Sequence, residues 1–143
     1  MGTTESKRWA AACHSGRPPS VNSRSPVGLL PRAGRTIAGH YPGDAFTSTT
    51  GSTVYYTVYA TALNNGYRVQ MAWDFYRGYT RLSGGGSPIL SSGSSYTWSN
   101  VATTVQSGKY GYYAVTRFDY LNPDGSVAFS SYVYCGPTYI TGN

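Results

Sequence analysis

The clearest alternation of apolar and polar side chains in this chain lies between residues 67 and 76. Every second residue there is large and apolar, and the residues between them are mostly polar. Because successive side chains of a strand point to opposite faces, this pattern predicts a half-buried β-strand with an aromatic core face. The apolar face consists of Tyr67, Val69, Met71, Trp73 and Phe75.

Weaker patterns of the same kind predict the other strands. Residues 54–61 alternate between apolar residues and Tyr or Thr, which favour strands. Residues 64–66 (Asn-Asn-Gly) predict a hairpin turn after them, because Asn-Gly is a strong hairpin signal. The Gly-rich and Ser-rich stretches at 84–86 and 91–95 are expected to be loops. Shorter strand signals stand at residues 96–98 and 137–141, which makes about seven strands separated by turns.

Residues 109–134 predict two long strands joined by a turn at residues 122–125 (Asn-Pro-Asp-Gly). Proline suits the second position of a tight turn, and glycine can take the positive φ that ends it. A hairpin closed there has a mostly apolar inner face, and a slip of one residue would invert every side chain. The predicted pairs are Tyr120 with Val127, Phe118 with Phe129, Thr116 with Ser131, Ala114 with Val133 and Tyr112 with Cys135.

The outward face of the same hairpin is rich in tyrosine and poor in charge. The predicted register sets Tyr113 opposite Tyr134 and Val115 opposite Tyr132. An aromatic surface with few charges is typical of the core of an interface, although a tyrosine ladder can also serve stability alone. The predicted binding surface comprises Tyr113, Val115, Arg117, Tyr132 and Tyr134, joined by Gln70 and Tyr76 if the strand at 67–76 lies alongside.

Composition divides the chain into two parts. Gly, Ser, Thr and Tyr dominate its 143 residues, only 11% of which are charged, and this scarcity of helix formers predicts an all-β protein. Residues 1–45 lack apolar periodicity and hold six basic and two acidic residues, hence +4 of the net charge of +6. We expect a flexible, disordered basic leader over residues 1–45, which processing could remove, and one folded domain over residues 46–143.

A basic leader can bind nucleic acid or an anionic membrane through phosphate charge. A solvated extension is the more ordinary interpretation of such a segment, so nucleic acid is not an expected partner. The leader has no apolar core like that of a secretory signal, and no apolar run in the chain reaches membrane-spanning length.

Three features together resemble an immunoglobulin-like domain. Trp73 faces inward where that fold often keeps a core tryptophan, residues 106–112 look like the approach to its sixth strand, and the long hairpin looks like its last two strands. The resemblance implies a two-sheet sandwich and gives Tyr110 the role of the corner tyrosine. Tyr112 stands where antibody domains have their second core cysteine, which implies a relative without the core disulfide, closer to fibronectin-like modules.

The cysteines and histidines do not indicate a particular chemistry. Cys13 and Cys135 could pair, but two cysteines make no disulfide framework, and Cys135 on the inner face is expected to be a small buried residue. His14 and His40 both lie in the leader, and no metal-ligand spacing such as Cys-x-x-Cys exists. We therefore expect no catalytic residue, no metal and no cofactor.

These observations predict a non-enzymatic extracellular or surface module that binds protein, including its own copies in a fibre or surface assembly. The extracellular location rests on the low charge and the Ser/Thr/Gly/Tyr-rich composition. One alternative is a carbohydrate-binding module that uses Tyr113, Tyr132 and Tyr134 as a platform. A secreted hydrolase or inhibitor is a further alternative, because this fold hosts many unrelated functions.

Overall fold

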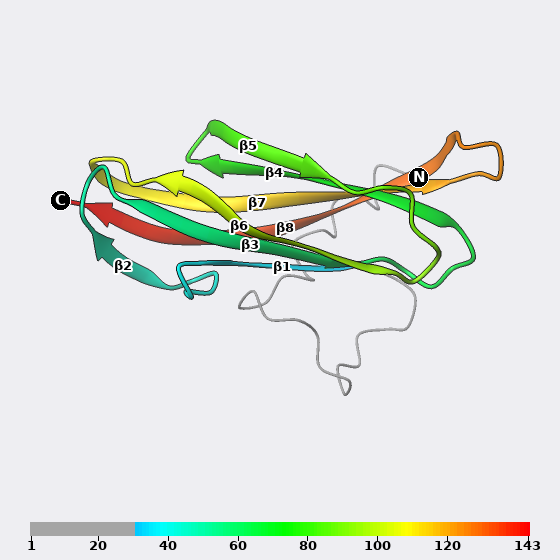
Figure 1. Ribbon diagram of the computed structural model, residues 1–143, viewed down its shortest axis with the longest axis horizontal. Helices are drawn as coiled ribbons and strands as arrows, with labels where there is room; N and C mark the ends of the chain where they lie inside the picture. Colours follow the sequence, from blue (N-terminus) through cyan, green and yellow to red (C-terminus); the bar gives the residue numbers. More distant parts are fainter. Residues whose placement is uncertain (1–30) are drawn as a thin grey trace.

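The computed structural model describes residues 31–143, and within them the chain forms eight strands and no helix (Figure 1). The prediction of an all-β protein is therefore confirmed. The strands are β1 (Arg32–Ile37), β2 (Ala45–Ser48), β3 (Thr53–Thr61), β4 (Arg68–Arg77), β5 (Thr80–Gly86), β6 (Ser95–Thr104), β7 (Gly108–Leu121) and β8 (Val127–Gly142).

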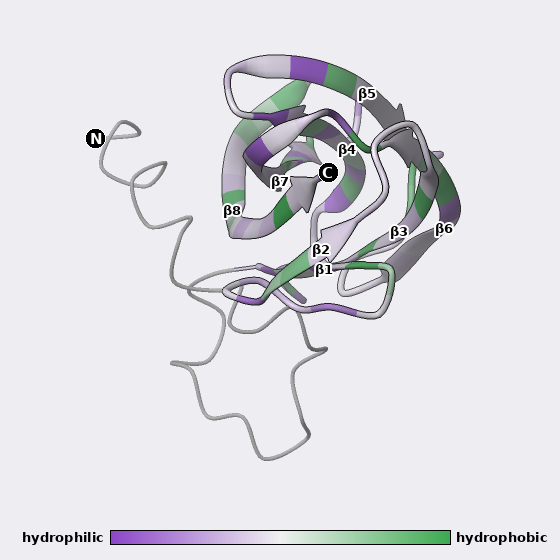
Figure 2. Ribbon diagram, turned by 90° about the vertical axis from the view of Figure 1, so that its left-hand side faces the viewer, coloured by the Kyte–Doolittle hydropathy of each residue, from purple (hydrophilic) through white to green (hydrophobic). Residues whose placement is uncertain are grey.

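The strands form two sheets that face each other. One sheet has the order β1-β3-β6 and the other β2-β8-β7-β4-β5. All neighbours are antiparallel except β2, which runs parallel to the end of β8. Figure 2 looks along the strands from the end where β8 finishes and shows the two sheets enclosing the core. The predicted two-sheet architecture is confirmed, with eight strands in place of about seven.

The core lies between the sheets and is built by the alternations seen in the sequence. The Tyr56 ring of β3 stacks on Phe75 of β4 with centroids 3.8 Å apart, and its edge meets Trp73 at 5.8 Å. Trp73 is buried, as predicted, whereas Tyr67 lies at the rim and is partly exposed. The alternating side chains that β3 and β4 bury are Val54, Tyr56, Val58, Ala60, Val69, Met71, Trp73 and Phe75.

Residues 84–86 are part of strand β5, so the prediction of a loop there is wrong. Gly85 lies opposite Trp73, and a Cβ at Gly85 would stand 2.8 Å from the indole Nε1. The indole therefore fills the space that a side chain would take. The Nε1 of Trp98 on β6 donates to the carbonyl of Gly86 at 3.1 Å, which joins the edges of the two sheets.

Residues 64–66 form a turn but not a hairpin, because β3 and β4 belong to different sheets. Gly66 has the positive φ of 85° that the Asn-Gly signal predicted. The backbone N–H groups of Asn65 and Gly66 donate to the Ser92 hydroxyl at 2.9 and 2.8 Å. This connection is held by the β5–β6 loop and not by a strand ladder.

The predicted domain boundary at residue 45 is wrong, because β1 pairs with β3 along its whole length. Ala33 and Ile37 are buried, and Arg35 is fully buried as well. The composition of residues 32–37 indicated a flexible leader because glycine and arginine interrupt the apolar pattern of this strand. Arg35 can be buried because β7 and β8 supply hydrogen-bond acceptors for its guanidinium. Residues 1–30 of the predicted leader, with Cys13 and His14, lie outside the described residues.

The turn at residues 122–125 forms as predicted. The Gly125 N–H donates to the Asn122 carbonyl at 2.9 Å, and Gly125 has a φ of 92°. A second bond from the Asn122 N–H to the Ser126 carbonyl, at 2.8 Å, closes the loop. The strands then begin at the pair Leu121–Val127.

The predicted register of this hairpin is wrong by two residues. The turn closes one residue later than predicted, and a bulge at Ala128 adds the second residue. Because the shift is even, inner residues stay inside. The observed pairs are Tyr120 with Phe129, Phe118 with Ser131, Thr116 with Val133 and Ala114 with Cys135, and beyond a second bulge Tyr112 lies opposite Thr138.

Two residues predicted in the core are partly exposed. Phe129 is 40% exposed, because β8 at this point has just left the turn, and its ring stacks on Tyr120. Tyr110 is 38% exposed near the start of β7, so it is not the buried corner tyrosine. Tyr112 is fully buried, and its hydroxyl accepts a bond from the Gln106 N–H at 3.4 Å. Phe118 is buried as predicted.

Cys135 is fully buried on the inner face, as expected. It is disulfide-bonded and therefore not a free thiol.

Candidate binding surface

The strand order brings the predicted binding surface together on the outer face of the five-stranded sheet. β4 lies beside β7, with Gln70 opposite Asp119 and Tyr76 opposite Tyr113. The intervening residues of these strands point into the core. All seven predicted residues share this outer face, namely Gln70 and Tyr76 of β4, Tyr113, Val115 and Arg117 of β7, and Tyr132 and Tyr134 of β8.

The predicted cross-strand pairs on this face are shifted with the rest of the hairpin. Val115 lies opposite Tyr134 and Arg117 opposite Tyr132, while Tyr113 stands at the second bulge. The Tyr113 ring nevertheless contacts Tyr134, with centroids 5.1 Å apart.

The rings of Tyr76, Tyr113 and Tyr134 form a row across three strands, which we call the tyrosine strip. Tyr76 and Tyr113 stack almost parallel, 12° apart with centroids at 5.1 Å, and Tyr134 tilts against Tyr113 by 52°. All three side chains are half-buried, and Tyr132 beside them is 37% exposed. The strip is thus a packed aromatic surface and not three isolated side chains.

The hydroxyls of Tyr113 and Tyr134 remain protonated at neutral pH. Burial raises the pKa of Tyr113, and the neighbouring Tyr76 and Tyr79 raise it further. Burial also raises the pKa of Tyr134, with Tyr113 among the groups that add to the effect. Neutral phenol groups can both donate and accept hydrogen bonds, as a polar rim around an apolar contact requires.

Two tyrosines that sequence reasoning missed extend the surface. Tyr79 is fully exposed in the turn between β4 and β5. Tyr139 of β8 lies over Gly111, where a Cβ would stand 3.2 Å from the ring, and the Lys109 Nζ is 5.4 Å from its ring centroid. The glycine opposite an aromatic residue could have indicated this, but the second bulge hid the pairing.

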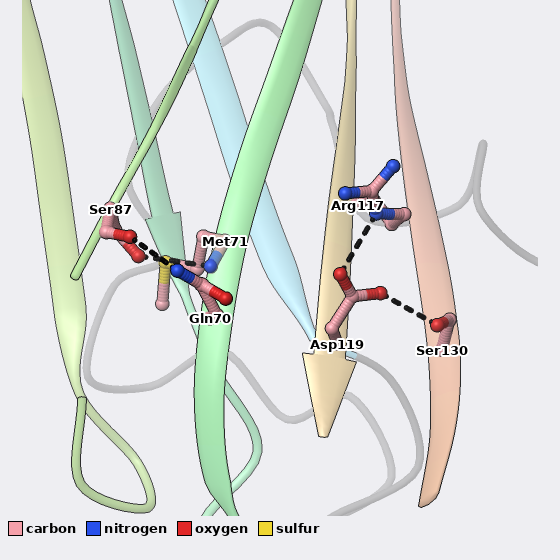
Figure 3. Close-up of polar contacts among 6 residues, drawn as sticks. All are labelled: Gln70, Met71, Ser87, Arg117, Asp119 and Ser130. Atoms are coloured by element: carbon pink, nitrogen blue, oxygen red, sulfur yellow. Dashed lines mark hydrogen bonds and ion pairs between the residues drawn. The ribbon is translucent and has the colours of Figure 1, made fainter. Parts of the chain in front are cut away.

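Four charged side chains of the five-stranded sheet form two ion pairs. The Asp119 carboxylate accepts a bond from the Arg117 Nε at 3.1 Å and one from the Ser130 hydroxyl at 2.7 Å (Figure 3). Asp74 similarly accepts from the Arg81 Nε at 2.8 Å. In the same close-up the Gln70 side chain donates to the Ser87 carbonyl at 3.2 Å. These pairs neutralise the charges of Arg117 and Arg81 beside the tyrosine strip.

No protein-family model matches this chain, and no curated protein matches it either.

The rest of the described chain offers few groups that could carry chemistry. Within residues 31–143, no three His, Cys, Asp or Glu side chains gather as metal ligands would, and no helix is long and apolar enough to cross a membrane. The His40 ring stacks on Phe46, 4.0 Å between centroids, and its Nδ1 lies 3.7 Å from the Asp44 carboxylate. A pocket of about 440 Å³ also opens where β4 begins and β7 ends. It is lined by Asn65, Gly66, Tyr67, Arg68, Leu121 and Pro123.

Proposed function

We propose that this chain is a non-enzymatic extracellular or surface module that binds protein, either a partner or its own copies, through the outer face of the five-stranded sheet. The observation that carries the proposal is the tyrosine strip. Its rings cross three strands on a face where Arg81 is paired with Asp74 and Arg117 with Asp119. Interface cores combine enriched tyrosine with few free charges, and this face has both properties.

The strand order supports an immunoglobulin-like sandwich as the scaffold. In that fold the first, second and fifth strands share one sheet, and the third, sixth and seventh share the other. Here β1, β3 and β6 form one sheet, and β4, β7 and β8 lie adjacent in the other, with β2 and β5 as added edge strands. The Tyr112 hydroxyl bound to the Gln106 backbone is similar to the tyrosine corner of the family.

The arrangement of the rings favours a protein ligand over a glycan. Sugar-binding platforms offer a free ring face, whereas Tyr76 and Tyr113 each give a face to the other. One observation favours the glycan alternative. Tyr132 is exposed, and no ring contact joins it to another aromatic residue of the described chain.

Light scattering of the full chain over a hundredfold range of concentration tests the proposal. We expect the mass to grow with concentration, and the double variant Tyr113→Ala with Tyr134→Ala to reduce this growth. Tyr55→Ala is the matched control, because Tyr55 is an exposed tyrosine on the other sheet. A constant monomer mass together with polysaccharide binding that Tyr132→Ala abolishes would replace the proposal with the glycan alternative.

A further inference from the structure

Among residues 31–143, most of one edge of β8 has no strand partner. β7 pairs along the whole of β8, but on the opposite edge β2 pairs only with Tyr139–Gly142. Backbone bonds from the loop before β2 reach Pro137 and Tyr139 and go no further. Among residues 31–143, no other backbone pairs with this edge between Phe129 and Val133. Alternate N–H and C=O groups of such an edge point away from the sheet and can pair with another strand.

The composition of this stretch does nothing to prevent pairing. Residues 129–133 read Phe-Ser-Ser-Tyr-Val, with no charge and no proline. Proteins commonly protect a free edge with lysine, proline or a bulge, and here the two bulges of β8, at Ala128 and after Cys135, lie outside the stretch. The nearest charges, Arg117 and Asp119 on β7, neutralise each other. An uncharged edge does not repel an identical edge.

We propose that residues 129–133 of β8 pair antiparallel with the same residues of a second copy, about a twofold axis at Ser131. This register places Phe129 of each copy opposite Val133 of the other, and Ser130 opposite Tyr132. Aromatic and β-branched residues are favourable cross-strand partners, and the contact occurs twice because the interface is isologous. Phe129 is 40% exposed in the monomer, so the second copy would cover an apolar ring that the fold leaves in solvent.

The inference does not rest on the tyrosine strip, because the edge and the outer face are different surfaces. Five paired residues make a small interface, so the dimer is expected to be weak and to form at high concentration.

Cysteine cross-linking of the full chain tests the register. In the proposed dimer the two Ser131 Cα atoms lie about 4.5–5.5 Å apart, within the range that a disulfide spans. We expect Ser131→Cys to give a covalent dimer on mild oxidation. Ala128→Cys is the matched control on the same strand, because its two copies would be about 20 Å apart. Equal cross-linking of both variants, or of neither, overturns the proposal.

A charge variant provides the second measurement. Ser131→Lys sets two like charges opposite each other at the axis, and we expect the dimer dissociation constant to rise about tenfold. Ser99→Lys on β6 is the control, because Ser99 is exposed on another edge strand. Dimers that survive Ser131→Lys unchanged contradict the proposal. If Tyr113→Ala leaves the Ser131→Cys cross-link intact, the β8 edge pairs independently of the tyrosine strip. The proposal of edge pairing can then fail or hold separately from the proposal that the tyrosine strip binds protein.

Discussion

The Nη2 of Arg35 donates a hydrogen bond of 2.6 Å to the carbonyl oxygen of Gly136, from one sheet to the other. The same guanidinium donates to the Tyr112 carbonyl at 3.2 Å and to the Thr138 hydroxyl at 2.7 Å. These acceptors surround the second bulge of the β7–β8 hairpin, where strand pairing is interrupted. Burial lowers the pKa of Arg35 to about 10. The three neutral acceptors therefore do not fully offset the desolvation of the cation.

Replacing Arg35 with Met is expected to lower the free energy of unfolding by about 1–3 kcal/mol. The substitution removes a donor from the buried Tyr112 carbonyl and from the half-buried Gly136 carbonyl, and relief of the buried charge offsets only part of that loss. Chemical denaturation at neutral pH measures the change. Arg35→Lys should also destabilise, because an ammonium cannot reach all three acceptors. A variant Arg35→Met as stable as the parent would show that the bulge does not depend on this residue.

Tyr112→Phe should lower stability by about 1 kcal/mol, because the Gln106 N–H loses its acceptor. Tyr110→Phe is the matched control and should stay within about 0.5 kcal/mol, because Tyr110 is partly exposed. Thermal unfolding of the two variants side by side checks the assignment. A larger loss of stability in Tyr110→Phe than in Tyr112→Phe would contradict this role of the Tyr112 hydroxyl.

Trp73→Ala is expected to cost about 3–5 kcal/mol by opening a cavity between the sheets. The substitution removes the ring contacts with Tyr56 and Trp98 and the packing of the indole on Gly85. A melting temperature that does not move in this variant would contradict the placement of Trp73 in the core.

Gly34→Ala should destabilise by about 1–3 kcal/mol, because a Cβ at Gly34 would overlap the Tyr59 ring that lies on it. Gly136→Ala is the control, since a Cβ there meets nothing and Gly136 has no positive φ. Circular dichroism melts of both variants test the difference. Equal stability of the two variants would mean that the Tyr59 ring can move aside without loss.

Stability should fall between pH 10 and 12. Burial raises the pKa of Tyr120 to about 12, so the unfolded chain loses this proton first as the pH rises. The stabilisation is present below pH 10 and is lost toward pH 12. Arg35, with its lowered pKa, acts in the opposite direction in the same range. Tyr120→Phe isolates the effect, and its stability should decline less steeply than that of the parent when unfolding is followed against pH.

Local sequence pattern was enough to predict the strands whose two faces differ. The alternation around Trp73 and the turn at Gly125 depend on neighbours in sequence, and both appear in the structure. The aromatic face was also predicted, because an error of two residues in register leaves every side chain on its own face.

Long-range partners explain what the sequence did not reveal. Arg35 is separated from Thr138 by 103 residues. The residues near Arg35 in the sequence do not indicate that its guanidinium will find a hydrogen-bond acceptor on β8. The glycines around Gly85 predicted a loop, because the sequence does not show that the Trp73 indole packs on Gly85. β1 and β5, two of the strands that were not predicted, are each built around a residue whose suitability is decided by another strand.

The indoles of Trp73 and Trp98 provide an optical readout of the seam between β5 and β6. Their ring centroids are 6.1 Å apart, but the buried Trp73 Nε1 has no hydrogen-bond partner among the described residues, while the Trp98 Nε1 donates to the Gly86 carbonyl. Opening of the seam would expose the Trp98 indole to solvent first and shift its emission maximum to the red. The Trp73 indole would stay buried and keep its emission maximum. With Trp9 replaced by phenylalanine, the fluorescence spectrum would separate local opening of the sheet edges from global unfolding.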